Sequence, residues 1–435
     1  MKKKIGVLMG GFTLERHISL ESGRNICSKL IASAQYDVMP LFLSGSMQEH
    51  RIFTLPTALL LKDNADDVHD YLLHPCKYDK QKEILNTIRA EAHSITKTYA
   101  KDAVFYPKEI DFKFIKDNID FVFIALHGRP GEDGTLQTIL EQYDIPYNGS
   151  GIATAALTID KYATNQLLAK NGFYVAKQFL ITDDQWSAAP DLLMDEIERI
   201  FNYPMIAKPI DDGCSSGVIK ITHRSHLLAY ASASFRAAQA LPDNLRQLLG
   251  LEVGAFFPQQ KCFLLEDFIR KDASMLACLE TTTGLLTYIS QNGNMIYEIF
   301  EPSEVLAAEG ILSLEEKFLA GEGHNITPAR FSSDKQSSMA ISQMVKTQLK
   351  TIAQTLNLQG YARIDAFVKI YSDQSVEVWV IEVNTLPAMT PATCIFHQAA
   401  LNGYSSFDFV DKIIQYGFTK RNFSTYSSIN FSKNG

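Results

Sequence analysis

The sequence predicts an α/β protein with an N-terminal doubly wound parallel sheet and an α+β C-terminal part. The opening of the chain reads strand, loop, helix, strand; strands and helices alternate again beyond residue 150; and a long amphipathic helix near the end precedes two strands. We expect an N-terminal domain over 1–148 with an insertion at about 46–118, a central domain over 149–266 and a C-terminal domain over 267–435.

The length and amino-acid composition of the chain limit the kinds of protein that it can be. A chain of 435 residues with 46% hydrophobic and 21% charged residues is long enough for two or three globular domains. The apolar run at 5–9 is too short for a secretory signal, and no window has membrane-spanning length. The formal net charge of -8 argues against nucleic acid as the main partner. The six cysteines form no CxxC pair, which predicts reduced thiols in a soluble, cytoplasmic protein without membrane partners.

The N-terminal domain begins with the strand KIGVLMGG, a helix from Ile18 to Ala34 and the strand VMPLFL. Ile26, Leu30 and Ile31 share one face of this helix. Polar, helix-like segments such as QKEILNTIRAEAH then occupy the insertion, before DFVFIAL reads as a strand buried on both faces.

The segment LHGRPGEDGTLQ, over 126–137, follows that buried strand. Ligands bind at the carboxyl ends of strands in open α/β sheets, and a glycine-rich turn into a helix offers free amides there. His127 is a candidate substrate contact. The alternative, which we favour for a lone histidine, is that it only hydrogen-bonds the turn.

In the central domain, PMIAK and GVIKIT read as strands around the loop KPIDDGCSSGV. Gly213 and Gly217 allow a close backbone approach, and Ser215 and Ser216 offer donors for phosphate oxygens. Lys208 could supply a point charge to the same phosphates. An ordinary hairpin turn is the alternative.

Near the C-terminus, an amphipathic helix over 338–356, with Ile341 and Met344 on its apolar face, precedes YARIDAFVKIY and VEVWVIEVNT. A hairpin centred between residues 373 and 374 would pair Asp365 with Glu382. Arg363 and Asn384 fall on the same face. Such oxygen ligands suit Mg²⁺. An ordinary cross-strand charge pair is equally consistent with the hairpin alone.

Taken in order, the motifs resemble those of one known family. They are GG-x-T-x-E-x-x-I-S-L, LHG-x-x-GEDGT-x-Q, IPY-x-GSG, DK-x-x-T, KP-x-x-x-G-x-SSGV, EKF, GYARIDAF and E-x-NTLP-x-MT. Over 1–45 and 119–420 the chain resembles the D-alanine–D-alanine ligases of the ATP-grasp superfamily. The resemblance implies an ATP-grasp fold and an enzyme of peptidoglycan precursor synthesis. Such an enzyme phosphorylates one D-alanine with ATP, and the amine of a second D-alanine attacks the acyl phosphate.

The resemblance also implies roles for site residues. The magnesium ligands, for two Mg²⁺ ions or for Mn²⁺ instead, would be Asp365, Glu382 and Asn384, and Arg363 would stabilise the transferring phosphoryl group and the oxyanion. The nucleotide contacts would be Lys161, Lys208, Lys317, Gly213, Ser215, Ser216, Glu266, Asp267, Phe268 and Ile269, with Glu266 accepting from the adenine amine. The substrate contacts would be Glu15, His127, Ser150, Phe318, Ala388 and Thr393, with Glu15 fixing the ammonium of the first D-alanine and Ser150 beside it.

The chain departs from the family pattern at several positions. Phe318 replaces a tyrosine of typical dipeptide ligases and resembles the pattern of ligases that accept D-lactate, so depsipeptide synthesis is an alternative. Ala273 replaces the glutamate that binds the ribose, which Asp272 could substitute. Ala388 replaces a glycine, and Cys214 a serine. A second alternative is a degenerate nucleotide-binding protein, against which the retained Glu15 and hairpin residues argue. The family also implies a homodimer.

Overall fold

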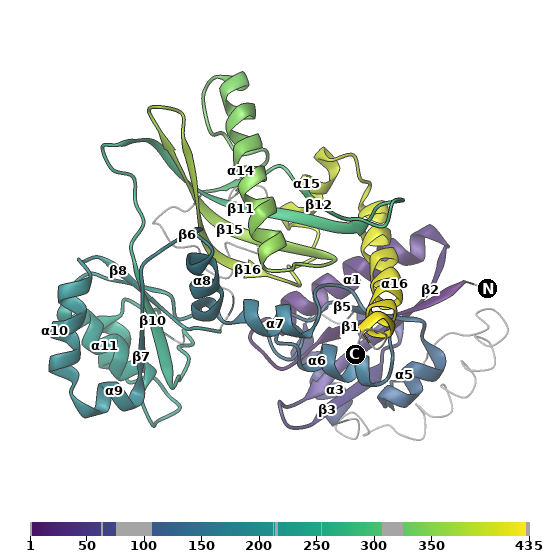
Figure 1. Cartoon of the computed structure of the whole chain (residues 1–435). Helices are drawn as coiled ribbons and strands as arrows, with labels where there is room; N and C mark the ends of the chain where they lie inside the picture. Colours follow the sequence, from purple (N-terminus) through teal and green to yellow (C-terminus); the bar gives the residue numbers. More distant parts are fainter. Residues whose placement is uncertain are drawn as a thin grey trace.

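The computed structural model describes residues 2–61, 64–74, 107–211, 213, 216–253, 255–306 and 325–431. In Figure 1 these residues form three parts, with the N-terminal part at lower right, the central part at lower left and the C-terminal sheet above them. The segment QKEILNTIRAEAH of the expected insertion lies outside the described residues.

The N-terminal part is a five-stranded sheet in the order β4-β3-β2-β1-β5. Strand β1 (Lys3–Gly10) runs parallel to both β2 (Tyr36–Gly45) and β5 (Phe121–Ile124). The sheet therefore has the expected parallel centre. Its helices are α1 (Arg16–Ser33), α2 (Thr57–Leu60), α3 (Ala65–Leu73), α5 (Phe112–Asn118) and α6 (Thr135–Gln142).

The sequence did not predict two strands of this sheet. β3 (His50–Thr54) pairs antiparallel with β2, and β4 (Lys108–Ile110) pairs antiparallel with β3, so both ends of the segment at 46–118 extend the sheet. Both strands are short and carry charged side chains, and β4 forms the sheet edge, so the apolar alternation that marks a strand is hidden. On α1, Ile31 was also misplaced, since it is 59% exposed.

The central part follows α7 (Ile152–Ile159) and α8 (Lys161–Lys170). Its four-stranded sheet has the order β7-β10-β8-β9, in which every neighbouring pair is antiparallel. These strands are β7 (Gln178–Thr182), β8 (Met205–Lys208), β9 (Ile219–Ile221) and β10 (Cys262–Asp267), and the helices are α9 (Asp183–Ala188), α10 (Pro190–Ile200), α11 (Arg224–Ser234) and α12 (Asp243–Leu248).

The C-terminal part is a seven-stranded sheet that follows the order β14-β13-β11-β15-β16-β6, with β12 paired to β11. Its strands are β6 (Tyr174–Val175), β11 (Met275–Ile289), β12 (Met295–Ile299), β13 (Ser303–Val305), β14 (Asn325–Ile326), β15 (Tyr361–Tyr371) and β16 (Val376–Asn384). Helix α14 (Lys335–Thr355) packs on the face of Ile364 and Val368. Met344 of this helix is 37% exposed, contrary to expectation.

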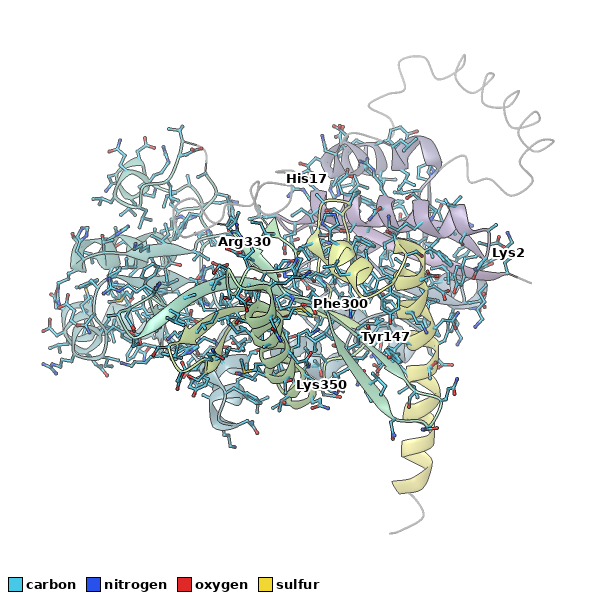
Figure 2. All side chains as sticks on the ribbon, turned by 90° about the horizontal axis from the view of Figure 1, so that it is seen from above. Lys2, His17, Tyr147, Phe300, Arg330 and Lys350 are labelled. Atoms are coloured by element: carbon cyan, nitrogen blue, oxygen red, sulfur yellow. The ribbon has the colours of Figure 1, made fainter. Side chains whose placement is uncertain are left out.

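Helices α15 (Cys394–Leu401) and α16 (Ser406–Phe431) contact the C-terminal sheet at β11. They join the core of the N-terminal part, in which Phe300 and Phe409 make an edge-to-face contact. Figure 2 shows Phe300 in the interior of the molecule, where this shared core lies. No helix among the described residues is long and apolar enough to cross a membrane.

Candidate active site

The polar face of the β15–β16 hairpin is built as the sequence predicted. Asp365 pairs with Glu382, and Arg363 pairs with Asn384. The register, however, arises differently. From Ala366 to Ile370 the strands pair around residue 373, and a bulge opposite the Asp365–Ala366 step adds Ile381 to β16. Without this extra residue, Glu382 would lie on the other face, because side chains alternate along a strand.

Asp365 is held by two neighbours. Arg363 donates to both of its carboxylate oxygens, from Nε at 2.9 Å and from Nη2 at 2.7 Å. Thr282 on β11 donates from Oγ1 to Asp365 Oδ1 at 2.6 Å. Although burial opposes the charge of Arg363, Asp365 and then Glu382 raise its pKa. The guanidinium is therefore charged at any working pH and lies beside both carboxylates.

The donor set on this face fits a hard divalent cation. It offers the carboxylates of Asp365 and Glu382 and the amide of Asn384, whose Nδ2 atom is buried without a hydrogen-bond partner among the described residues. Lys161 Nζ lies 3.8 Å from Glu382 Oε2. The described part of the chain holds no group of three or more His, Cys, Asp and Glu side chains placed for a metal. Mg²⁺ is commonly bound by only a few protein carboxylates, and phosphate oxygens complete its coordination.

Glu15 precedes α1 and lies in a cavity that is also lined by Lys161, Glu382 and Asn384. Two glycines pack against its carboxylate. A Cβ built on Gly213 would lie 2.7 Å from Glu15 Oε1, and one built on Gly128 would lie 2.9 Å from Oε2. A side chain at either position would therefore push the carboxylate aside, whereas glycine lets the loop of the central part lie directly against Glu15.

Glu132 is a second carboxylate in the same cavity that the sequence did not single out. Its Oε2 accepts from the Gly128 amide at 2.8 Å, and its Oε1 accepts from the Leu386 amide at 3.2 Å. Burial, and then the charge of Glu15, raises the pKa of Glu132 to about 8. Glu132 thus fastens the turn after β5 to the loop after β16.

His127 is buried and joins the same two loops. Its Nδ1 lies 3.0 Å from the Leu386 carbonyl, and its Nε2 lies 2.9 Å from Ser22 Oγ. Ser22 Oγ in turn accepts from the Met389 amide at 3.0 Å. One tautomer satisfies all three, with Nδ1 protonated and Nε2 accepting from Ser22. Burial lowers the pKa of His127 to about 4, so the ring is neutral.

Ser150 is buried and lines neither this cavity nor the one beside Arg363. Its Oγ accepts from the Gln359 amide at 3.0 Å. The contact ties the loop before α7 to the turn before β15. The structure therefore places Ser150 as a link between the N-terminal and C-terminal parts.

A second cavity is lined by Arg363. Its lining includes Thr282, Asp365, Ala388, Thr393 and Cys394. Ala388 does not belong to the non-glycine residues with positive φ, so alanine fits the backbone at this position. Thr393 occupies the N-cap position of α15, and its Oγ1 donates to the Thr390 carbonyl at 2.7 Å instead of capping the helix. Burial raises the pKa of the Cys394 thiol.

The expected nucleotide residues cluster at the sheet of the central part. Lys208 ends β8, and its Nζ lies 2.7 Å from Glu266 Oε2 on β10. Gln178 donates to Glu266 Oε1 at 2.7 Å. Both Lys208 and Glu266 are buried, which is tolerable because each charge faces its counterion.

The loop and the strand end near this ion pair supply further groups. Ser216 has a buried hydroxyl without a partner among the described residues, which leaves it available to an acceptor. Phe268 lies under Lys220, whose Nζ is 4.4 Å from the ring centroid. Asp267 ends β10, with Ile269 just beyond it. The expected site residues Ser215, Lys317 and Phe318, and the departure Cys214, lie outside the described residues.

Comparison with known proteins bears on this arrangement. The family model described as "D-ala D-ala ligase N-terminus" matches residues 4–150, and "D-ala D-ala ligase C-terminus" matches residues 273–415. A D-alanine–D-alanine ligase of Carboxydothermus hydrogenoformans is 30% identical over 70% of this chain and 84% of its own length. That of Chlorobaculum parvum is 24% identical over 97% of this chain and 98% of its own length.

Solved structures agree in fold. The D-alanine–D-alanine ligase of Coxiella burnetii superposes with a TM-score of 0.64 at 17% identity, covering 99% of this chain and 98% of that one. A D-Ala:D-Ser ligase of Enterococcus faecalis gives a TM-score of 0.63 at 20% identity, covering 96% of this chain and all of that one. The arrangement of sheets and helices is the ATP-grasp fold of these ligases.

Proposed function

The chain belongs to the D-alanine–D-alanine ligase family, and on that premise we propose that it joins two D-alanines into D-alanyl-D-alanine at the expense of ATP. A carboxylate oxygen of the first D-alanine attacks the γ-phosphorus, and ADP leaves. The amine of the second D-alanine then attacks the carbonyl carbon of the acyl phosphate, loses a proton and expels phosphate. The product is a precursor for peptidoglycan.

One observation carries this proposal. The cavity that holds Glu15 also reaches Glu382 and Asn384 on the hairpin, so a carboxylate for an ammonium group adjoins a carboxylate and amide for a phosphate-bound cation. An enzyme that phosphorylates an amino acid needs these two groups at this proximity, because the ammonium fixes the carboxylate that is to react. A protein that only binds nucleotides needs no such arrangement.

Asp365, Glu382 and Asn384 would hold the divalent cation, which we propose to be Mg²⁺. When bound, it would neutralise charge on the phosphates of ATP. Other residues of the chain would orient the cation ligands and contact the phosphates. Thr282 donates to Oδ1 of Asp365 and Arg363 to both of its oxygens, so the two residues orient this carboxylate. Lys161, which faces Glu382 at 3.8 Å, is placed to contact a phosphate oxygen on the same side.

Arg363 lines the cavity of Ala388 and Thr393, and its Nη2 lies 3.8 Å from Oε1 of Glu382, which lines the cavity of Glu15. We assign the second D-alanine to that cavity. A charged guanidinium there stabilises the oxyanion that forms when the amine attacks. Burial makes this interaction stronger, because water screens the charges less.

The central part would supply the nucleotide site. Lys208 and Ser216 would contact phosphate oxygens, and Glu266 with the backbone of Asp267 to Ile269 would recognise adenine. The buried Lys208–Glu266 ion pair supports this assignment of roles, because at 2.7 Å each charged side chain holds the other in place inside the nucleotide site. Gln178 donates to the second oxygen of Glu266 and orients it.

The test is release of phosphate by the purified protein with ATP and Mg²⁺, given D-alanine alone or D-alanine with D-lactate, with products identified by mass. Dipeptide from D-alanine alone is the expected result. Depsipeptide in the mixture would instead make Phe318 the determinant of the second substrate, and Phe318→Tyr should then shift the product toward dipeptide. ATP binding without either product would contradict the proposal.

A further inference from the structure

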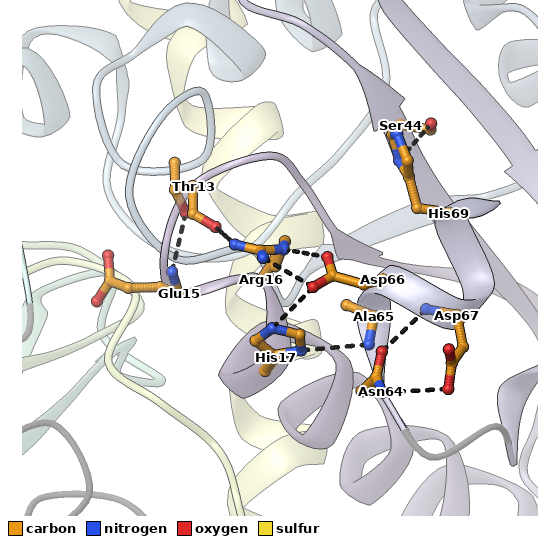
Figure 3. A network of polar contacts seen from close by, with 10 residues as sticks. All are labelled: Thr13, Glu15, Arg16, His17, Ser44, Asn64, Ala65, Asp66, Asp67 and His69. Carbon is orange, nitrogen blue, oxygen red and sulfur yellow. Dashed lines mark hydrogen bonds and ion pairs between the residues drawn. The ribbon is translucent and has the colours of Figure 1, made fainter. Parts of the chain in front are cut away.

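A polar network outside both cavities joins the first turn of α1 to the first turn of α3 (Figure 3). Arg16 donates from Nε to Asp66 Oδ1 at 2.5 Å and from Nη2 to Asp66 Oδ2 at 2.9 Å. This is a two-pronged contact, the geometry in which an arginine–carboxylate pair is most directional. It crosses from the helix that follows Glu15 to the segment that no sequence motif explained.

The same guanidinium reaches the loop that carries Glu15. Arg16 Nη1 donates to the Thr13 carbonyl at 3.0 Å. Thr13 Oγ1 accepts from the Glu15 amide at 3.3 Å and donates to the His127 carbonyl at 3.2 Å. Glu15 therefore stands between two residues, Thr13 and Arg16, that are both fixed through the Arg16 side chain.

The end of the network that lies on α3 is also held in place. α3 buries Ala65, Val68 and Leu72 in the core shared with α1. His17 Nδ1 accepts from the Ala65 amide at 3.3 Å, and Asn64 caps the helix by accepting from the Asp67 amide at 2.9 Å. Asp66 is therefore held by a docked helix, and its carboxylate offers Arg16 a fixed pair of acceptors.

We propose that Asp66 and Arg16 are positioning residues for Glu15, so that α3 sets the affinity of the site for the ammonium group of the first D-alanine. This inference rests on the proposed function, in which Glu15 binds that ammonium. Arg16 fixes Thr13, which accepts from the Glu15 amide, and the carboxylate of Glu15 points away from Arg16 (Figure 3). The carboxylate of Glu15 then lies against Gly128 and Gly213, at positions where a Cβ atom would come within 3 Å of it.

The Arg16–Asp66 ion pair is not expected to act mainly by stabilising the fold. The Arg16 and Asp66 side chains are 27% and 58% exposed, and exposed ion pairs contribute little to folding. The chain offers a matched pair in the same segment. Arg51 donates to both oxygens of Glu109 at 2.8 Å and 2.7 Å, with exposures of 33% and 49%, and neither residue lines the cavity of Glu15.

The experiment compares Asp66→Asn with Glu109→Gln in the full-length enzyme. Each change replaces a carboxylate by an amide of the same shape, so that one prong of the arginine contact meets a donor. We expect Asp66→Asn to raise the KM for the first D-alanine about fivefold and to change kcat by less than about twofold, because the ammonium contact is made equally in the ground state and the transition state. Glu109→Gln should leave both constants unchanged, and Asp66→Glu should restore most of the affinity.

A double-mutant cycle with Glu15→Gln separates the possible failures, with the affinity for the first D-alanine measured by calorimetry in the presence of an unreactive ATP analogue. If Asp66 acts through Glu15, adding Asp66→Asn to Glu15→Gln changes the affinity no further. Equal effects of Asp66→Asn and Glu109→Gln, or an additive cycle, would overturn this inference and leave the proposed function intact. Unchanged D-alanine affinity in Glu15→Gln alone would instead overturn the role of Glu15 in the proposed function.

Discussion

The central part of the chain packs around its own core. The C-terminal part has a core of its own under α14 and in addition shares one with the N-terminal part. Ile197, Tyr230 and Phe263 belong to a cluster drawn wholly from the central part. Leu8 of the first strand and Phe409 of the last helix belong to one other cluster. The residues assigned to acyl transfer thus stand mostly on one jointly packed body, and most of those assigned to the nucleotide stand on a separately packed one.

The contacts between these two bodies are of a different kind. Arg129 of the N-terminal part lies 2.7 Å from Asp211 of the central part and 2.9 Å from Asp133 of its own. The Gly213 loop rests on Glu15 without a side chain between them. Polar and glycine contacts of this sort bury little apolar surface, so we expect the central part to move relative to the shared body.

Removing one aromatic ring from each core tests this difference most strongly. Phe409→Ala and Phe263→Ala both empty a fully buried site, and each should cost about 3 to 5 kcal/mol. Hydrogen exchange should differ between them. We expect Phe409→Ala to lower protection in both the N-terminal and the C-terminal sheet, and Phe263→Ala to lower it only in the central sheet. Loss of protection throughout by Phe263→Ala would contradict the separation of the cores.

Acid should weaken the joint between the N-terminal and C-terminal parts at His127. Its pKa in the folded protein is about 4, below the ordinary value of 6.5, so the unfolded chain binds the extra proton between these values. The stability that neutral His127 contributes is thus complete above pH 6.5 and lost as the pH falls toward 4, by about 3 kcal/mol.

The measurement is the difference in unfolding free energy between the wild type and His127→Gln at several pH values. Glutamine does not titrate, so the difference should shrink as the pH falls, and contributions common to both proteins, such as that of Glu132, cancel. A difference that is constant between pH 7 and pH 4 would show that His127 is not buried as a neutral ring.

On the shared body, Glu382→Gln should lower Mg²⁺-dependent turnover about a hundredfold, because the amide keeps the shape and loses the charge that a divalent ion requires. Glu377→Gln is the matched control on the same strand. Glu377 accepts from Tyr371 and Trp379, both at 2.8 Å, at the far end of the hairpin. Turnover at increasing Mg²⁺ should be rescued in part for Glu382→Gln, and an unchanged Mg²⁺ response would remove Glu382 from the metal site.

How far the sequence predicted these features depends on the range of the contacts. The pairing of Asp365 with Glu382 lies within one hairpin, so side-chain alternation nearly suffices, although the bulge at Ile381 left no signal. The partners of His127 are Ser22 and Leu386, which are 105 and 259 positions away. No local pattern predicts such contacts. Glu132 belongs to the motif LHG-x-x-GEDGT-x-Q, but only the folded structure shows that it lies in the same cavity as Glu15.

Thr282 illustrates the same limit and gives the mildest test of the shared body. It stands in a run of three threonines on β11, and only the register with β15 brings its hydroxyl to Asp365. Thr282→Val keeps the shape and removes the donor, so Asp365 loses one of its two orienting partners. We expect the Mg²⁺ concentration for half-maximal turnover to rise about tenfold, as is usual when a partner of a metal ligand is removed.

Thr281→Val is the control for this last change, because Thr281 is equally buried but donates to the Ala366 carbonyl at 3.1 Å. Each valine should cost about 1 kcal/mol of stability through the lost hydrogen bond. Only Thr282→Val should alter the Mg²⁺ response, since only its hydroxyl touches the carboxylate. If both variants shift the response equally, β11 acts through its packing, and the orientation of Asp365 depends on Arg363 alone.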